Sequence, residues 1–285
     1  MKDNTPPSSI VPATPAQPAA FAAKTGVSRR QLIAGGIGLI GLSASATGAY
    51  AGAVEPTDLL ITPYTLTPPN WPMGQKLTIT VIADLHAGGP HITLRQVARI
   101  VDTANALQSD LVVLLGDYKA HYKLPLEPIE DALWGAELGR LRAPLGVWAI
   151  LGNHDWWFDA HGVRKALADA RIPLLENDAV LLGAPGRKFW LAGLGDQLAH
   201  WIGPGRFRGV DDLAGTLRQI GTDDPVLLLV HEPDIFPRVP ERVSLTLAGH
   251  TMAGRSAYRS SGRNSCRRAT ARALPTVTSS KTAAT

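Results

Sequence analysis

The stretch KLTITVIAD, residues 76–84, decides the fold class of this chain. Its apolar residues form a nearly continuous run, which predicts a buried strand, and the run ends on the polar residue Asp84. Four later stretches repeat this pattern of an apolar run that leads into polar residues: LVVLLGD (111–117), GVWAILGN (146–153), VLLLVHEP (226–233) and SLTLAGH (244–250). The sequence therefore predicts at least five buried strands.

Segments with the apolar spacing of amphipathic helices lie between these runs, at 92–108, 127–141, 161–171 and 210–220. Residues 179–194 predict a hairpin around the turn APGR. Strands that alternate with helices predict an α/β fold, in which ligand-binding groups gather beyond the carboxyl ends of the strands. The 285 residues are enough for one such domain with appended segments.

Polar residues with ligand chemistry follow each predicted strand. They are Asp84, His86, Asp117, Asn153, His154, Asp155, His231 and His250. One Asp in such a place is more often a turn or helix cap, and one His is usually a satisfied surface or core residue. Five groups at five strand ends are harder to explain in this way, because carboxylates are not buried without partners. Carboxylate, imidazole and amide oxygen are together the ligands of borderline-hard divalent metals, and so many ligands favour two ions.

The order Asp-x-His, Gly-Asp, Gly-Asn-His-Asp, His and Gly-His resembles the calcineurin-like metallophosphoesterase family over residues 76–251. The stretches TLTPPNWP, IADLHAG and LGNHDWW are closer still to its bacterial branch with an N-terminal signal or anchor. The resemblance implies a four-layer αββα sandwich and metal-dependent hydrolysis of phosphoesters. Some members of that branch act on phosphodiesters or on the pyrophosphate of a UDP-linked lipid A precursor, so we expect a lipid-linked or nucleotide-linked phosphodiester substrate.

The resemblance also implies a role for each site residue. The implied metal ligands are Asp84 and His86 for the first ion, Asp117 for both ions, and Asn153, His231 and His250 for the second ion. A hydroxide between the two ions, which could be Mn, Fe, Zn or Mg, would attack phosphorus in line. His154 would donate a proton to the leaving group or stabilise its charge, and Asp155 would orient His154. Trp156 and Trp157 are candidates to flank an acyl or nucleoside group, with core packing as the alternative.

One position departs from the family pattern, which continues Gly-His-x-His. The stretch TLAGHTMAGRSAY, residues 246–258, has Met252 in place of the last histidine, which would complete the first metal site. A thioether is a soft, weak ligand for a hard cation. An inactive or non-catalytic exported metal-binding protein is therefore the alternative function. The residues after Met252 are rich in Arg, Ser, Ala and Thr, so we expect no core strand there and the final strands of the second sheet to be missing.

Loss of one cytosine before the Met252 codon would account for both departures. Restoring it changes ATG to CAT, a histidine codon, and the next alanine codon to a glycine codon. With permitted codons, TMAGRSAYR becomes THGGQVRLP, which has the glycine-rich turn of the family. We therefore predict a frameshift after Thr251, and a genuinely divergent tail is the alternative.

The net charge of +4 arises from this tail alone. Residues 253–285 hold seven Arg and Lys residues and no Asp or Glu, which leaves 21 of the 28 basic residues against all 24 acidic residues. The basic tail of a frameshifted chain would not indicate a nucleic-acid partner. We therefore expect a small-molecule or lipid-linked phosphoester as the partner, and no nucleic acid. The single cysteine, Cys266, excludes an intramolecular disulfide.

The sequence predicts five segments: a disordered region (1–27), an export signal or anchor (28–54), a linker (55–75), a C-terminally truncated metallophosphoesterase domain (76–251) and the basic tail (252–285). Arg29 and Arg30 precede a Gly/Ala-rich apolar stretch, which resembles a twin-arginine export signal and could also be a short membrane anchor. We therefore expect the twin-arginine export machinery as a partner. The expected location is the periplasm, the cell envelope or the membrane surface.

Overall fold

The computed structural model describes residues 59–89, 92–120 and 128–250, and the backbone of two further strands at 257–260 and 277–282. The predictions for the N-terminal region, for the export signal and for Met252 lie outside these residues. Within the described part of the chain, no helix is long and apolar enough to cross a membrane.

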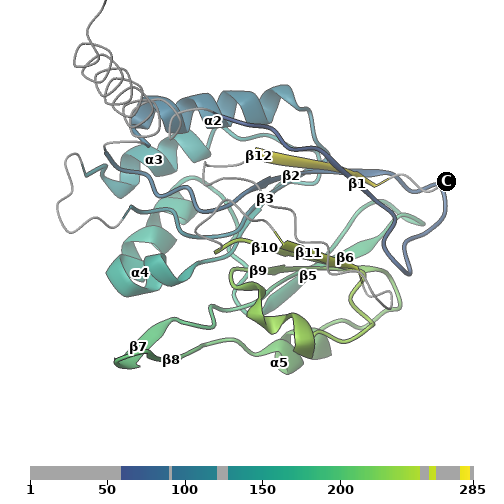
Figure 1. The fold of residues 1–285 in the computed structure, drawn as a ribbon. Helices are drawn as coiled ribbons and strands as arrows, with labels where there is room; N and C mark the ends of the chain where they lie inside the picture. The colour runs from purple at the N-terminus through teal and green to yellow at the C-terminus, as the bar shows by residue number, and fades with distance from the viewer. Residues whose placement is uncertain (1–58, 90–91, 121–127, 251–256, 261–276, 283–285) are drawn as a thin grey trace, which may run out of the picture. The chain divides into compact units, whose positions relative to one another are not determined.

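Two five-stranded sheets form the centre of the fold (Figure 1). The first sheet has the order β1 (Tyr64–Leu66), β12 (Val277–Thr282), β2 (Leu77–Ile82), β3 (Leu111–Leu114) and β4 (Val147–Ala149). The second has the order β11 (Ala257–Ser260), β10 (Leu245–Ala248), β9 (Val226–Val230), β6 (Phe189–Gly193) and β5 (Asp178–Leu182). Strands β2, β3 and β4 are parallel, as are β10, β9 and β6. All five strands predicted from the apolar runs are confirmed, and so is the hairpin of β5 and β6.

The remaining elements are α2 (Leu94–Ala106), α3 (Asp131–Leu138), α4 (Asn153–Asp169), α5 (Leu213–Arg218), the 3-10 helix η3 (Pro233–Arg238) and the hairpin of β7 (His200–Gly203) and β8 (Arg206–Arg208). Thr93 begins α2 by accepting a hydrogen bond from the Gln96 amide at 3.3 Å. This helix buries Val97, Ile100 and Val101 on one face. The apolar face packs in the same hydrophobic cluster as the first sheet.

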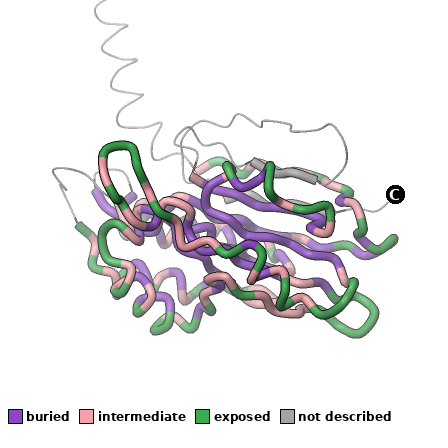
Figure 2. The backbone as a smooth tube through the Cα atoms, turned by 90° about the horizontal axis from the view of Figure 1, so that it is seen from below, coloured by how far each residue is buried: buried purple, intermediate pink, exposed green. Residues whose placement is uncertain are grey.

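Three hydrophobic clusters separate four layers of structure. One lies between the first sheet and the helices α2, α3 and α4, and another lies between the second sheet and the segment of α5 and η3. The third joins the two sheets, with Ile79 and Val113 from the first and Leu229 and Leu247 from the second. Strands β3, β9 and β10 are buried along their whole length and β2 and β6 along most of it, whereas β5 is half-buried and the hairpin of β7 and β8 is largely exposed (Figure 2). These layers confirm the predicted αββα sandwich, which buries its strands on both faces.

The expectation that the basic tail supplies no strand is wrong. Residues 257–260 pair antiparallel with β10 at the edge of the second sheet, and residues 277–282 pair antiparallel with β2 in the first sheet. Sheet pairing uses main-chain N–H and C=O groups, so an open strand edge accepts a segment that has few large aliphatic residues. Val277 and Thr278 are also β-branched, which favours extended backbone.

Replacement of Leu229 by Ala tests the cluster between the sheets. Leu229 has no exposed surface, so we expect Leu229→Ala to lower the free energy of unfolding by about 2–5 kcal/mol. Urea denaturation followed by circular dichroism measures this change. Leu133→Ala is the matched control, because the Leu133 side chain on α3 is exposed and its loss should cost less than about 0.5 kcal/mol. Equal losses in the two variants would contradict the assigned core.

Candidate metal centre

The predicted site residues follow strands of both sheets and meet at the carboxyl ends of those strands. Their places are Asp84 and His86 after β2, Asp117 after β3, Asn153, His154 and Asp155 after β4, His231 after β9, and His250 after β10. The first three strands belong to one sheet and the last two to the other. The carboxyl ends of parallel strands meet at one edge of each sheet, so the sandwich brings both edges together around one site.

Four of these residues have a backbone conformation that is rare outside glycine. The φ angles are 52° at Asp84, 43° at His86, 58° at Asp117 and 67° at His250. Hydrogen bonds between neighbouring loops hold this conformation, since the amide of Asp84 donates to Gly116 and the amide of His86 donates to the Asp117 carbonyl at 2.9 Å. Left-handed backbone at non-glycine residues clusters at functional sites, where the surrounding structure offsets its cost.

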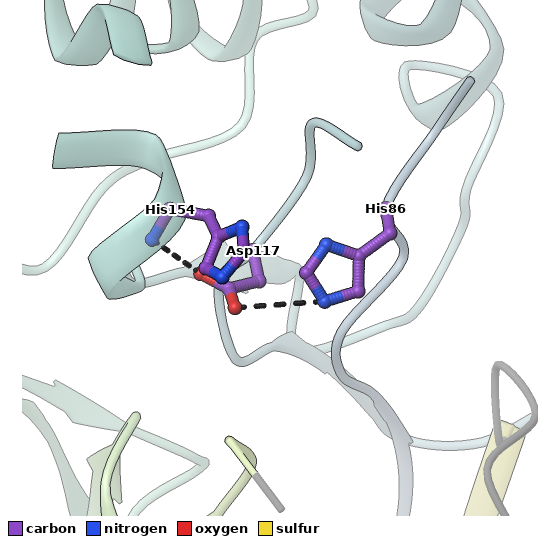
Figure 3. Close-up of side chains that lie close together, drawn as sticks. All are labelled: His86, Asp117 and His154. Atoms are coloured by element: carbon purple, nitrogen blue, oxygen red, sulfur yellow. Dashed lines mark hydrogen bonds and ion pairs between the residues drawn. The ribbon is translucent and has the colours of Figure 1, made fainter. Parts of the chain in front are cut away.

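Asp117 is the central residue of the site (Figure 3). Its Oδ2 atom lies 3.6 Å from Nε2 of His86 and 3.3 Å from Nε2 of His231, and its Oδ1 atom accepts a hydrogen bond from the His154 amide at 2.9 Å. Burial alone would raise the pKa of Asp117, but the positive charges of His231 and His86 hold that pKa well below its ordinary value. The carboxylate is therefore ionised and shared between residues of the two sheets.

The residues from the second sheet form the other half of the site. Nδ1 of His231 lies 2.6 Å from the carbonyl oxygen of Leu115, which fixes the ring so that Nε2 faces Asp117. Nδ1 of His250 lies 2.8 Å from Oδ1 of Asn153, and its amide donates to both carboxylate oxygens of Asp84 at 3.1 Å. The pairs thus connect strand ends of different sheets.

Two side-chain groups can each hold a cation. His86, Asp117 and His154 form one and Asp117, His231 and His250 form the other, with the ligand atoms of each group within 4.8 Å of one another. The buried Nε2 of His231 has no hydrogen-bond partner among the described residues. Burial would lower the pKa of His231, but the charges of Asp117, Asp84 and Glu232 together outweigh burial and raise that pKa. A nearby positive charge therefore stabilises the ionised carboxylates of this site, and a divalent cation would supply such a charge. The carboxylate and imidazole donors fit a divalent cation.

Asp84 adjoins this site through the hydrogen bonds that it accepts from the His250 amide. Burial raises the pKa of the Asp84 carboxyl, and the charge of Asp117 adds to the rise, against the attraction of His231, His86 and His250. A carboxyl in this position is stabilised in its ionised form by cations, because a nearby positive charge offsets its desolvation. Its implied role as a ligand of the first ion stays a prediction.

The Asp155 side chain supports the loops rather than facing solvent. Its Oδ2 atom accepts hydrogen bonds from the amides of Asp117 at 2.8 Å and Gly152 at 2.9 Å, and its Oδ1 atom accepts one from Tyr118 at 2.8 Å. The bond from Gly152 also begins α4, eight residues before the start that apolar spacing predicts. Burial raises the pKa of Asp155 to about 7, and the Asp117 charge adds to the rise. That Asp155 orients the His154 ring stays a prediction, since these hydrogen bonds go to backbone.

Replacement of Asp155 by Asn tests this support. The Asn side chain has only one acceptor oxygen, so its NH2 group would face an amide N–H and leave it buried without a partner. We expect Asp155→Asn to lower the free energy of unfolding by about 1–3 kcal/mol and to weaken metal binding by about 10–100-fold. Urea denaturation and calorimetric metal titration measure the two effects. Asp169→Asn, at an exposed position on the same helix, should change neither; unchanged metal affinity in Asp155→Asn would contradict the assignment.

The sequence reading missed two buried carboxyls beside the site, Asp196 and Glu232. Together with His231 they form a third group whose ligand atoms lie within 4.8 Å of one another. Glu232 accepts a hydrogen bond from the Gln197 amide at 3.0 Å, and burial, followed by the charge of Glu232, raises the pKa of Asp196 to about 9. The signal was present, because Asp196 follows β6 as the other site carboxylates follow their strands.

Aromatic side chains surround the His154 ring. Its centroid lies 4.9 Å from that of His86, 5.3 Å from that of Trp157 and 5.7 Å from that of Phe158. The Trp157 indole donates a hydrogen bond to the Leu198 carbonyl at 2.8 Å, which fixes its plane. Trp156, the other candidate from the sequence, packs instead against the hydrophobic cluster of the first sheet. Of the two tryptophans, Trp157 is thus the one that borders His154.

A four-layer αββα sandwich with carboxylate, imidazole and amide side chains at the strand ends of both sheets defines a class of α/β folds with a candidate metal site between the sheets. Residues 77–269 match the family described as calcineurin-like phosphoesterase. The chain belongs to this family, whose members hydrolyse phosphoester bonds.

Three curated relatives illustrate the range of the family. The metallophosphoesterase YkuE of Bacillus subtilis is 30% identical over 243 residues, which cover 80% of this chain and 78% of that protein. A transmembrane protein with metallophosphoesterase domain from Danio rerio is 30% identical over 186 residues, 62% of this chain. Phosphodiesterase YaeI of Escherichia coli is 28% identical over 181 residues, 62% of this chain and 60% of that protein. The chain spans only 40% of the length of the Danio rerio relative.

Proposed function

We propose that this protein hydrolyses phosphoesters, with phosphodiesters as the preferred class, by means of two divalent cations. The observation that carries the proposal is the position of Asp117, whose Oδ2 atom lies between the Nε2 atoms of His86 and His231 from different sheets. A shared carboxylate flanked by imidazoles on both sides suits two cations that have one ligand in common. Phosphodiesterase YaeI, a relative named for this activity, supports the class of substrate.

The residues of the site would have two roles, cation binding and stabilisation of the leaving group. Asp84, His86 and Asp117 would hold one cation, and Asn153, His231 and His250 with Asp117 would hold the other. Bound cations would polarise the phosphoryl oxygens and lower the pKa of water. The His154 ring lies beside His86, where it can donate a proton to the leaving oxygen or stabilise its charge. The amide of His154 donates a hydrogen bond to Oδ1 of Asp117, and this bond holds the His154 residue next to the shared carboxylate.

A metal-dependent assay tests the proposed function. The purified full chain is stripped with a chelator, reloaded with Mn²⁺, Fe²⁺, Zn²⁺ or Mg²⁺, and assayed with aryl phosphodiesters and phosphomonoesters. We expect hydrolysis that requires added metal and two equivalents of bound cation. Metal binding without hydrolysis, even after Met252→His with the re-framed tail, would instead establish the alternative of a non-catalytic metal-binding protein.

The substrate proposed within this class is a lipid-linked or nucleotide-linked phosphodiester, such as a UDP-linked lipid A precursor. Trp157 and Phe158 support it, because they border His154 and are partly exposed, so they could contact an acyl chain or a base. The assay compares kcat/KM for this precursor with that for the aryl phosphodiester. A lower kcat/KM for the precursor would exclude it.

We further propose export through the twin-arginine machinery, and a location outside the cytoplasm or at the membrane. Lys in place of both Arg29 and Arg30 should prevent export of a reporter fused to the full chain, whereas unchanged export would contradict this.

For the C-terminal tail, we propose that the gene has lost one cytosine before the Met252 codon. Resequencing of the gene from the Gly249 codon to the Ser256 codon decides between GHTHGGQ and the chain as written.

A further inference from the structure

Exposed apolar side chains gather on two neighbouring segments. Within residues 59–89, 92–120 and 128–250, eight large apolar side chains are exposed, and four of them lie at the start of α4 and on β7. The exposed fractions are 37% for Trp157, 39% for Phe158, 64% for Trp201 and 47% for Ile202. Single exposed apolar residues are ordinary, but a contiguous group of this kind marks an interaction surface.

Ring contacts and strand pairing connect the aromatic residues of this group. Trp157 stacks on Phe207 of β8 with the centroids 5.3 Å apart, and Phe207 pairs across the hairpin with Trp201 of β7. Cross-strand partners point to the same face, so the aromatic row runs from His154 through Trp157 and Phe207 to Trp201. In Figure 1 the hairpin projects from the body of the sandwich below α4. The row therefore leads from the metal centre to the end of a projecting hairpin.

The charge of the hairpin differs from that of the rest of the domain. Residues 199–210 contain the exposed Arg206 and Arg208 and no Asp or Glu, although residues 1–252 carry more acidic than basic residues. Neither arginine forms an ion pair with another described residue. The next acidic residue along the chain, Asp211, already pairs with Arg238 at 3.3 Å. Two positive charges without an ion pair to a described residue thus lie on β8, the strand that pairs with β7 and its exposed Trp201.

We propose that the hairpin of β7 and β8, together with Trp157 and Phe158, docks the protein onto an anionic lipid bilayer. Tryptophan prefers the boundary between headgroups and acyl chains, and arginine beside it is attracted to anionic headgroups. A two-stranded hairpin has little stability of its own in water, so immersion of its apolar residues also gives it a partner. Docking goes beyond the proposed hydrolysis and does not depend on it, although it would bring His154 close to lipid phosphoesters.

A label on the hairpin tests docking locally, which separates it from any binding by the N-terminal segment. The full chain carries Cys266→Ser and Ile202→Cys, and an environment-sensitive fluorophore is attached at residue 202. The control carries Cys266→Ser and Met73→Cys, with the same fluorophore at an exposed apolar position on a different loop. Both proteins are titrated with vesicles of phosphatidylcholine and phosphatidylglycerol, and with vesicles of phosphatidylcholine alone.

We expect a blue shift at residue 202 with the anionic vesicles, and none at residue 73 or with the neutral vesicles. Arg206→Gln with Arg208→Gln should move the midpoint of the titration to a roughly 30-fold higher lipid concentration, since each arginine near an anionic surface contributes about fivefold. No shift at residue 202, an equal shift at residue 73, or an equal shift with neutral vesicles would each overturn the proposal.

A second variant separates docking from catalysis. Trp201→Ser in the labelled protein should abolish the blue shift and leave hydrolysis of a soluble aryl phosphodiester unchanged, because Trp201 is exposed on the hairpin and is not one of the proposed metal ligands. An undiminished shift in this variant would overturn docking through the aromatic row. If no protein hydrolyses the soluble substrate while the shift is present, the proposed function fails and docking stands.

Discussion

Asp117→Asn is expected to abolish nearly all hydrolysis of an aryl phosphodiester. The Asn side chain has one acceptor oxygen, so it cannot serve both the His154 amide and the two imidazoles that face the carboxylate. Loss of cation stabilisation worth several kcal/mol corresponds to a fall in kcat of about 10³-fold or more. The bound cation should also fall below two equivalents. Initial rates at saturating Mn²⁺, with metal analysis of the same samples, measure both effects.

The control for this variant is Asp102→Asn, a neutralised carboxylate at an exposed position that pairs with Arg140. It should retain the kcat and the metal content of the parent chain. Circular dichroism distinguishes loss of function from loss of fold. A folded Asp117→Asn protein with a kcat within tenfold of the parent would show that the shared carboxylate is not part of the catalytic site.

Gly152→Ala is the second variant with a large expected effect. A Cβ atom at residue 152 would lie 2.4 Å from Oδ1 of Asp117 and 2.6 Å from Cε1 of His231, well inside van der Waals contact. Both contacts are with side chains of the proposed ligands, so relief of the clash must displace residues of the candidate metal centre. A displacement of about 1 Å costs roughly 10² in rate, and overpacking costs about 1–3 kcal/mol of stability. Steady-state kinetics and thermal denaturation measure these effects.

Gly221→Ala provides the matched comparison, because a Cβ atom at residue 221 would meet nothing within 4 Å. This variant should keep the activity of the parent and its midpoint of thermal denaturation. Gly152→Ala with parental activity would mean that the loops around residue 152 rearrange freely. In that case the close packing of Gly152 against Asp117 would not position the catalytic groups.

The candidate site residues could be picked out from the sequence because of a local regularity. Each of the five apolar runs leads directly into its polar residues, and parallel strands present their carboxyl ends at one edge. Sequence spacing thus placed Asp117 and His231 near one site although 114 positions separate them. It did not show that two different sheets contribute to the site, since strand pairing depends on contacts between distant segments.

The start of α4 was predicted less well. Residues 153–160 lack the apolar spacing of a helix, so periodicity placed the helix start at residue 161. The structure begins the helix at Asn153, where the Asp155 carboxylate accepts amides from its own turn and from the loop after β3. Hydrogen bonds to a neighbouring loop therefore decided a boundary that the local pattern could not indicate. The residue Asp159, with φ −164°, marks the kink between the two parts of this helix.

The strands of the tail and the hairpin of β7 and β8 show the same limit. Residues 257–260 and 277–282 have no apolar run, and they extend because open edges of β10 and β2 offer main-chain partners. The sequence also did not predict that Asp196 and Glu232 lie close together. They are 36 positions apart, and the parallel pairing of β6 with β9 brings them together.

The sequence by itself determined the α/β class, the five buried strands and the carboxylate, imidazole and amide side chains that follow them, because these depend on apolar periodicity and on the residues at each strand end. The tertiary structure alone decided which of these side chains face one another, how the loops hold Asp84 and His86 in left-handed backbone, and where exposed aromatic residues meet. Such features arise from contacts between segments far apart in the chain, and local pattern carries no information about those contacts.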